Sequence, residues 1–287
     1  GVRLRFSNEL DLLRAEIARE FPAQRGNFER LIDEVVEYDD LDESHQQISA
    51  RQRIAEIITE PLLVEMFFCP LMFYGSAREH DMDWGQFCIM FRSIFMEGFA
   101  RPLAGVRLIL KQMVRRFREL GGELKLRHGV DRFKLDDGHE QGVVLDDGTE
   151  IVARVVVSNA DPKRTFLGML EEGDLPGDFR DDVAAIKMSG PCAKVNLALR
   201  EEPVWSGMPA GASPNQRSLA TLVPTLEQAQ RSYDQHQWGE LPDELWVDCV
   251  TASNVDDTLV DQTVAPGRHV MTCFVQYLPF ALREGTW

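Results

Sequence analysis

The chain has 287 residues, of which 44% are hydrophobic, and its 31 Lys and Arg against 47 Asp and Glu give a formal charge of −16. This charge excludes a nucleic-acid-binding role, because phosphate neutralisation needs a basic surface, and the hydrophobic fraction excludes a disordered chain. The length predicts about two domains, with cores that need neither disulfides nor metals.

The five cysteines are odd in number, widely spaced and include no Cys-x-x-Cys pair. They argue against a disulfide framework and indicate a reducing, cytoplasmic compartment. The longest apolar run, residues 61–74, is shorter than the ~20 residues that span a bilayer. No signal peptide is recognised at the start. The chain begins Gly1-Val2 and stops at Trp287 directly after a strand-like run, so we expect a piece of a longer protein.

Helical spacing dominates the first hundred residues. Ser7 is a suitable N-cap for an apolar stripe over residues 10–21. Two further stripes cover residues 28–36 and 54–58, each with the period of one helix face. Pro61 then breaks or kinks the chain. These patterns predict a helical region.

The period changes from helical to alternating after residue 120. A helix is expected over 107–120, ended by Gly121-Gly122, because glycine adopts the left-handed C-terminal position without steric cost. Asp137-Gly138 and Asp147-Gly148 separate alternating runs, which is a strong hairpin signal. The segment therefore predicts one strand followed by a three-stranded meander. The expected strands are 123–127, 130–135, 142–145 and 150–158.

Helix and strand signals mix in the last part of the chain. Asp161 is a good N-cap and Pro162 suits the first helical position, so a helix is expected there. Residues 203–216 are rich in Pro, Gly, Ser and Ala and predict a long loop. The strands expected in this part are 193–199, 245–251 and 269–276.

Most motifs that carry chemistry are absent from the sequence. It contains no Gly-x-Gly-x-x-Gly, Walker loop, His-Glu-x-x-His or Gly-x-Ser-x-Gly. Glu79-His80-Asp81 has ligand-type side chains, but consecutive residues rarely converge on one ion, and a solvated loop explains them. No metal site and no catalytic residue is therefore predicted.

Met and aromatic residues are dense between residues 62 and 99. Two interpretations are open. These side chains form a hydrophobic core, or they line an apolar pocket, because Met and aromatic groups adapt to bulky hydrophobic ligands. The pocket interpretation selects five candidate substrate-binding residues: Met90, Phe91, Phe95, Phe274 and Tyr277.

Residues 105–169 resemble the phytoene dehydrogenase-related flavoproteins of the amine-oxidase-like FAD superfamily. The similarity rests on ELGGELKL at 119–126, GVVLDDGTEI at 142–151 and VVVSNADPKRTF at 155–166. Residues 189–199 and 263–280 look like substrate-domain strands of the branch called pyridine nucleotide-disulphide oxidoreductase domain-containing. The resemblance is weak before Gly105 and covers most of the chain.

The resemblance implies an α/β protein of mixed α+β character. It would contain an incomplete doubly wound, Rossmann-like FAD/NAD(P)-binding domain with a β-meander, and a substrate domain with helices and a mixed sheet. Residues 1–103 would form the helical part of the substrate domain, 104–165 the partial FAD-binding domain, and 166–287 the remaining helices and antiparallel strands. The strand at 123–127 would belong to the doubly wound sheet.

The resemblance also implies four cofactor-binding residues. The backbone of Val130 would touch the adenine end of FAD, and the Asn159-Ala160 turn would lie near the dinucleotide. The alternative for this turn is a strand exit followed by the helix cap at Asp161. Gly105 stands where the family often has a Gly-Gly-Met turn facing the flavin, but Ala104 and Val106 depart from that pattern.

The family holds the FAD diphosphate with a Gly-x-Gly-x-x-Gly turn and returns to the flavin with a Gly-rich segment, and this sequence has neither. The missing parts would belong to a longer protein, come from a second chain, or be lost in a remnant that cannot hold FAD. Three hypotheses follow: an FAD-dependent dehydrogenase or desaturase acting on a hydrophobic, isoprenoid or lipid substrate; a non-catalytic module that binds lipid or protein; and a peripheral membrane protein.

Overall fold

The computed structural model describes residues 4, 9–41, 48–71, 82–98, 100–136 and 139–287. Backbone contacts divide the chain into two compact units. The first consists of residues 1–109 and 190–287, and the second of residues 110–189. The boundaries at 103 and 165 expected from the sequence remain a prediction.

Helices form the N-terminal part of the first unit, as the sequence predicted. Pro61 occupies the first position of one helix, where its missing N–H costs nothing. The first helix begins after Glu9, and the expected cap Ser7 lies outside the described residues. The helices are α1 (Leu10–Glu20), η1 (Pro22–Gln24), α2 (Arg25–Glu37), α3 (Ala50–Ile57), α4 (Pro61–Leu71), α5 (Trp84–Phe91) and a π-helical turn, η4 (Arg92–Glu97).

These helices enclose a hydrophobic core, which we call the helical core. Its aromatic centre includes Phe28, Phe67 and Phe91, all at most 1% exposed. Side-chain caps fix two of the helix starts: Ser49 accepts a hydrogen bond from the Gln52 N–H at 3.0 Å, and Asp83 caps α5 in the same way. Two large side chains from the C-terminal half, Trp246 and Tyr277, also belong to this core.

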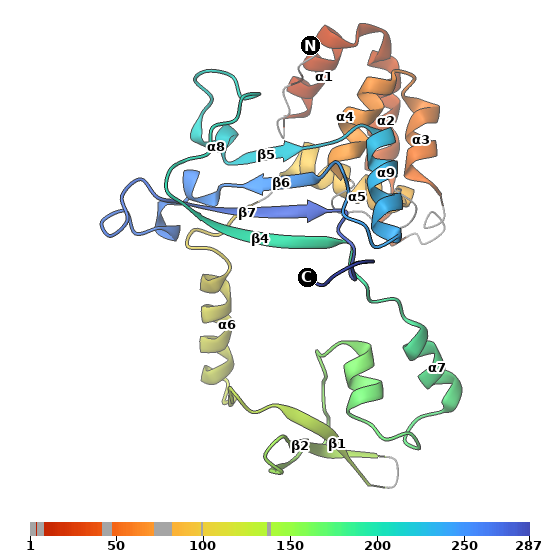
Figure 1. Ribbon diagram of the computed structural model, residues 1–287, viewed down its shortest axis with the longest axis vertical. Helices are drawn as coiled ribbons and strands as arrows, with labels where there is room; N and C mark the ends of the chain where they lie inside the picture. Colours follow the sequence, from red (N-terminus) through yellow and green to blue (C-terminus); the bar gives the residue numbers. More distant parts are fainter. Residues whose placement is uncertain (1–3, 5–8, 42–47, 72–81, 99, 137–138) are drawn as a thin grey trace. The chain divides into compact units, whose positions relative to one another are not determined.

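A four-stranded sheet completes the first unit (Figure 1). Its strands are β4 (Cys192–Leu199), β5 (Leu219–Leu222), β6 (Trp246–Val250) and β7 (His269–Gln276), in the spatial order β4-β7-β6-β5. All three strand pairs are antiparallel, so the prediction of a sheet with both parallel and antiparallel strands is wrong. The sequence predicted β7 with its observed bounds and missed β5. Short elements connect the strands: α8 (Pro214–Arg217), α9 (Leu226–Gln237), η6 (Ala252–Asn254) and η7 (Asp257–Leu259).

The second unit contains the predicted meander. Its strands β1 (Val130–Asp136), β2 (His139–Leu145) and β3 (Glu150–Val152) form an antiparallel sheet in chain order. Gly148 adopts a φ of +83° in the β2–β3 turn, which explains the Asp-Gly signal. Three helical elements belong wholly or mainly to this unit: α6 (Arg107–Glu119), a π-helical turn, η5 (Arg164–Gly168), and α7 (Gly177–Ala185).

The strand expected at 123–127 is wrong. Residues 123–127 have no strand partner among the described residues, although Leu124 and Leu126 alternate as a strand requires. An alternating run forms a strand only where a neighbour accepts its backbone hydrogen bonds. The last meander strand is also shorter than expected, because its pairing with β2 ends at Val152.

Candidate active site

The sheet face that adjoins the helical core carries one row of four side chains, which we call the polar row. In the strand register, Thr221 lies opposite Asp248, Asp248 opposite Phe274, and Phe274 opposite Lys194. Residues directly opposite one another in antiparallel strands project from the same face. Phe274 packs against the margin of the helical core, which identifies this face as the one toward the helices.

Phe274 is the centre of the polar row, with a carboxylate on one side and an ammonium on the other. Neighbouring strands are about 4.8 Å apart, so the backbones at Asp248 and Lys194 are separated by roughly 10 Å. Lys194 is exposed and Asp248 is half-buried, so both contribute to a surface rather than to the core.

Asp248 has an unusual electrostatic environment for a carboxylate on a sheet. Burial raises its pKa, while a hydrogen bond from the Thr221 hydroxyl at 2.7 Å acts in the opposite direction. In the next row of the same face, the Thr272 hydroxyl donates to Asn196 Oδ1 at 2.9 Å and extends the polar surface. A carboxylate with a raised pKa exchanges protons closer to neutral pH than an ordinary Asp.

The five candidate substrate-binding residues lie together in or against the helical core. Phe91, Phe95 and Tyr277 are at most 3% exposed, and the Phe91 and Phe95 ring centroids are 4.8 Å apart. Met90 and Phe274 are partly buried and pack on the margin of this core. The geometry therefore gives Phe91, Phe95 and Tyr277 a packing role and leaves Met90 and Phe274 partly exposed at the margin of the core.

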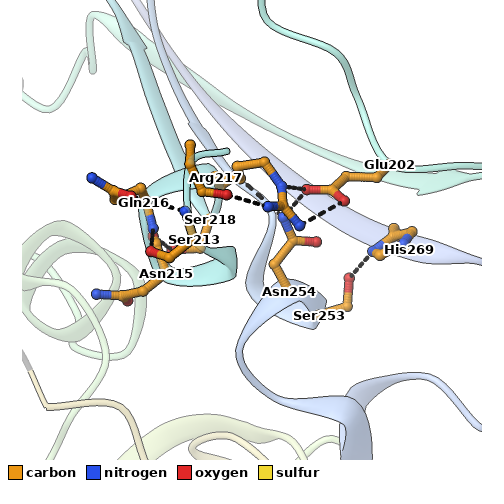
Figure 2. A network of polar contacts seen from close by, with 10 residues as sticks. Glu202, Ser213, Asn215, Gln216, Arg217, Ser218, Ser253, Asn254 and His269 are labelled. Carbon is orange, nitrogen blue, oxygen red and sulfur yellow. Dashed lines mark hydrogen bonds and ion pairs between the residues drawn. The ribbon is translucent and has the colours of Figure 1, made fainter. Parts of the chain in front are cut away.

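A second polar cluster lies where the loops at one end of the sheet meet, as Figure 2 shows. The Arg217 guanidinium donates to both oxygens of Glu202, at 2.7 and 3.3 Å, and the Asn254 amide donates to Glu202 at 2.6 Å. The bond from Arg217 is the main reason that the pKa of Glu202 is lowered. In the same view, the Ser253 hydroxyl and His269 Nδ1 are 3.1 Å apart. These contacts fix the loops that enter β5 and β7.

The turn that contains Gly105 is attached to the segment next to this cluster. The Ala104 N–H donates to the buried Asp256 carboxylate at 2.9 Å. A hydrogen bond from the Thr258 hydroxyl is the main cause of the lowered pKa of Asp256. Ala104 and Gly105 both have positive φ, +64° and +75°, and a Cβ at Gly105 would meet only Leu259, at 3.8 Å. The backbone of this turn is therefore open to close approach by a ligand.

The other three candidate cofactor-binding residues lie in the second unit. Val130 is the half-buried first residue of β1 and pairs with Leu145. Asn159 is exposed, and the Ala160 N–H donates to Ser158 Oγ at 3.3 Å. Asp161 Oδ1 accepts from the Arg164 N–H at 3.0 Å, which agrees with the helix-cap interpretation of Asp161. The cofactor roles themselves remain predictions.

The residues present fit one end of a flavin dinucleotide. An aromatic floor with a cation and a carboxylate beside it suits a flat ring system with polar edges, and the polar row supplies these groups. A diphosphate needs a Gly-rich turn at a helix N-terminus, and the sequence contains no Gly-x-Gly-x-x-Gly. The chain therefore offers side chains suited to the flavin ring of FAD, but it lacks the Gly-x-Gly-x-x-Gly motif that would hold the diphosphate.

The described part of the chain contains no group of three His, Cys, Asp or Glu side chains arranged to hold a metal. Glu79-His80-Asp81 lies outside the described residues. Among the helices that the structure describes, none has the length and apolar character needed to cross a membrane.

Lys194 and Asp248 were not selected from the sequence. The signal was present in one strand: Lys194 and Asn196 alternate with Val195 and Leu197, which marks one polar face. Which strands lie beside this one follows only from the fold, so the row itself could not be predicted.

Comparisons with known proteins agree with the resemblance. Residues 5–242 match the family described as flavin containing amine oxidoreductase. The chain is 29% identical over 154 residues to the mouse (Mus musculus) pyridine nucleotide-disulfide oxidoreductase domain-containing protein 2, which covers 52% of this chain and 26% of that protein. It is 40% identical over 78 residues to the neurosporene-forming phytoene desaturase of Rhodobacter capsulatus, covering 27% of this chain and 15% of the desaturase.

A solved oxidoreductase from Methanosarcina mazei has a similar fold, with a TM-score of 0.56 and 15% identity, over 89% of this chain and 52% of that one. The chain thus matches about a quarter or less of these curated relatives and about half of the solved structure. The family match extends over most of the chain and agrees with the phytoene dehydrogenase-related resemblance. The chain belongs to the flavin-containing amine oxidoreductase family.

Proposed function

We propose that the chain forms the central part of an FAD-dependent oxidoreductase that removes hydride from a hydrophobic substrate. The polar row beside the margin of the helical core is the observation that carries the proposal. One sheet face there combines groups suited to a flavin ring with an apolar neighbourhood suited to a substrate. Similarity to proteins named phytoene desaturase supports a dehydrogenase or desaturase type and an isoprenoid or lipid substrate.

Residues 104–165 would contribute to the FAD-binding domain, a doubly wound fold completed by segments of a longer protein or by a second chain. In this proposal Gly105, Val130, Asn159 and Ala160 contact the cofactor. The exposure of apolar side chains on α6 supports a missing partner: none of its residues is buried, although one of its faces is apolar. Such a face is typical of a surface that another part covers.

The residues of the polar row would have separate roles. Phe274 would support the ring system, and Lys194 would stabilise by Coulomb attraction the negative charge that accumulates over it. Asp248 would hold or exchange a proton at its carboxylate, because its raised pKa favours the neutral form. Bound FAD would accept the hydride and supply the redox chemistry. Met90 and the partly buried apolar margin would exclude water from the reaction.

The first measurement is the absorption spectrum of the purified protein between 300 and 550 nm, together with its intact mass. Flavin bands would support the oxidoreductase. A colourless protein of 32.6 kDa that takes up no added FAD would show that this chain is not an enzyme by itself. The binding-module alternative would then lead.

The roles can be tested in the protein that retains flavin, with phytoene in detergent micelles as the probe substrate. Lys194→Met is expected to lower the rate of flavin reduction roughly tenfold to hundredfold while the flavin content is unchanged. Lys187→Met is the matched control, because Lys187 is exposed, lies in the other unit and stands outside residues 104–165. Equal rates in the two variants would contradict the role of Lys194.

The alternative is a non-catalytic module that binds lipid or a protein. The exposed apolar side chains of Leu110, Met113 and Phe117 on α6 favour it, because a lipid or protein partner could cover them. Peripheral membrane contact is compatible with the enzyme and with the binding module, although a charge of −16 opposes attraction to anionic lipid. Flotation with liposomes at low and high salt tests it, and no association in either condition would remove it.

A further inference from the structure

Two buried cysteines face each other on the side of the sheet opposite the polar row. Cys249 of β6 and Cys273 of β7 are directly opposite in the register. Their Sγ atoms are 3.7 Å apart, and the residues are 4% and 8% exposed. They belong to a small apolar cluster with Met271 and Val275, and both thiols are free. Neither thiol has a part in the proposed function.

The distance between the strands suits a covalent link between these two side chains. Cα atoms of directly opposite residues in antiparallel strands are about 4.5 or 5.5 Å apart, and disulfides join residues whose Cα atoms are about 4.4–6.8 Å apart. The sulfurs are already in van der Waals contact, so a small movement of both side chains closes the remaining distance. We propose that Cys249 and Cys273 are an oxidation site, at which hydrogen peroxide converts the thiol pair to a cross-strand disulfide.

The chemistry balances with one peroxide. The first thiol sulfur gives two electrons to the O–O bond, which breaks to leave a sulfenic acid and one water. The second sulfur then attacks the oxidised sulfur, so that the S–S bond forms and the S–O bond breaks. The departing oxygen takes the proton of the second thiol and leaves as a second water. In sum, two thiols and one peroxide become one disulfide and two waters.

The surroundings of the pair set its rate. Burial, followed by the interaction with Cys273, raises the pKa of Cys249 to about 12. Thiolate is therefore scarce at neutral pH, and the first oxidation is slow. The second step is different, because the partner sulfur is already 3.7 Å away and reacts within the same molecule. A disulfide, rather than a doubly oxidised sulfur, is the expected product.

The disulfide would lie directly behind the polar row. Cys249 follows Asp248 in β6, and Cys273 precedes Phe274 in β7. Asp248 and Phe274 are themselves an opposite pair of the same two strands. Oxidation would therefore tether the strands that present two residues of the polar row. The oxidation itself does not rest on the proposed function, because it needs only the thiols and the oxidant.

The sequence allows a direct test by peptide mapping of the folded 287-residue chain. Trypsin cuts after Arg231, Arg268 and Arg283, which places Cys249 in peptide 232–268 and Cys273 in peptide 269–283. After treatment with hydrogen peroxide and alkylation of remaining thiols, we expect the two peptides as one species, lighter than their sum by two hydrogens. Reduction with dithiothreitol should separate them. The linked species should form faster at about pH 9 than at about pH 7.

Two variants and one condition serve as controls. Cys273→Ser should abolish the linked species, and Cys192→Ser should leave it unchanged, because Cys192 is exposed and lies in a different peptide. Recovery of both peptides alkylated or as separate sulfonic acids would overturn the proposal. So would a link that forms only when the chain is first unfolded in urea, because the proposal depends on the native register.

Discussion

Replacement of Phe91 by Ala distinguishes a core side chain from a substrate-lining one. Phe91 is 0% exposed, and its ring centroid lies 5.4 Å from that of Phe67, 5.7 Å from Phe87 and 4.8 Å from Phe95. Removal of a buried phenyl ring with three aromatic neighbours costs roughly 3–5 kcal/mol, which includes the cavity that the neighbours cannot fill. A loss near 4 kcal/mol lowers the folding equilibrium constant about a thousandfold.

The assay is urea unfolding followed by far-ultraviolet circular dichroism, with the free energy of unfolding taken from the midpoint at unchanged slope. Phe280→Ala is the matched control, because Phe280 belongs to the same unit and is 68% exposed. It should change the free energy of unfolding by about 0.5 kcal/mol or less. Because both variants replace Phe by Ala, their difference isolates the effect of burial on the free energy of unfolding.

The reasoning would be refuted if Phe91→Ala unfolded within about 1 kcal/mol of Phe280→Ala. That result would mean that the Phe91 side chain borders a space that tolerates its loss, as a pocket wall does. The candidate substrate-binding role of Phe91 would then replace its packing role.

Two further predictions concern the meander and the polar row. Gly142→Ala should destabilise the meander by more than about 2 kcal/mol, because a Cβ there would lie 1.9 Å from the Ile151 carbonyl oxygen; hydrogen exchange of the β1–β3 amides measures it. Gly148→Ala, at φ +83° in open space, should cost about 1 kcal/mol, and equal losses would refute the clash. Asp248→Asn should stabilise the protein at neutral pH, because burial raises the pKa of Asp248 in the folded state and the wild-type protein loses stability as the pH rises above the pKa in the unfolded state, about 3.9. The urea midpoints of the wild-type and variant proteins should converge below that pH, and a difference that stays constant with pH would refute the assignment.

Local sequence patterns predicted the elements that carry a strong signal of their own. The β2–β3 turn follows from Asp147-Gly148, and β7 from a long run of strand-favouring residues over 269–276. Failure came where the local signal is short or where the described part of the chain holds no partner strand. Residues 123–127 alternate but have no partner strand among the described residues, and β5, with four residues and no polar alternation, is held by pairing with β6.

The candidate site shows the same limit. The family resemblance selected Gly105, Val130, Asn159 and Ala160 as cofactor-binding residues. The structure places only Gly105 in the unit that contains the four-stranded sheet. Lys194 and Asp248 are separated by more than fifty residues and meet only because β7 lies between their strands. No local pattern contains that order, because strand order is a property of the whole sheet.

The two central strands carry both the polar row and the thiol pair because side chains alternate along a strand. Asp248 and Cys249 point to opposite faces of β6, and Phe274 and Cys273 do the same on β7. A slip of one residue between these strands would separate both opposite pairs at once. A disulfide formed from the native pair would therefore fix the register that also sets Asp248 beside Phe274. The oxidation proposed for one face and the ligand binding proposed for the other both depend on this register.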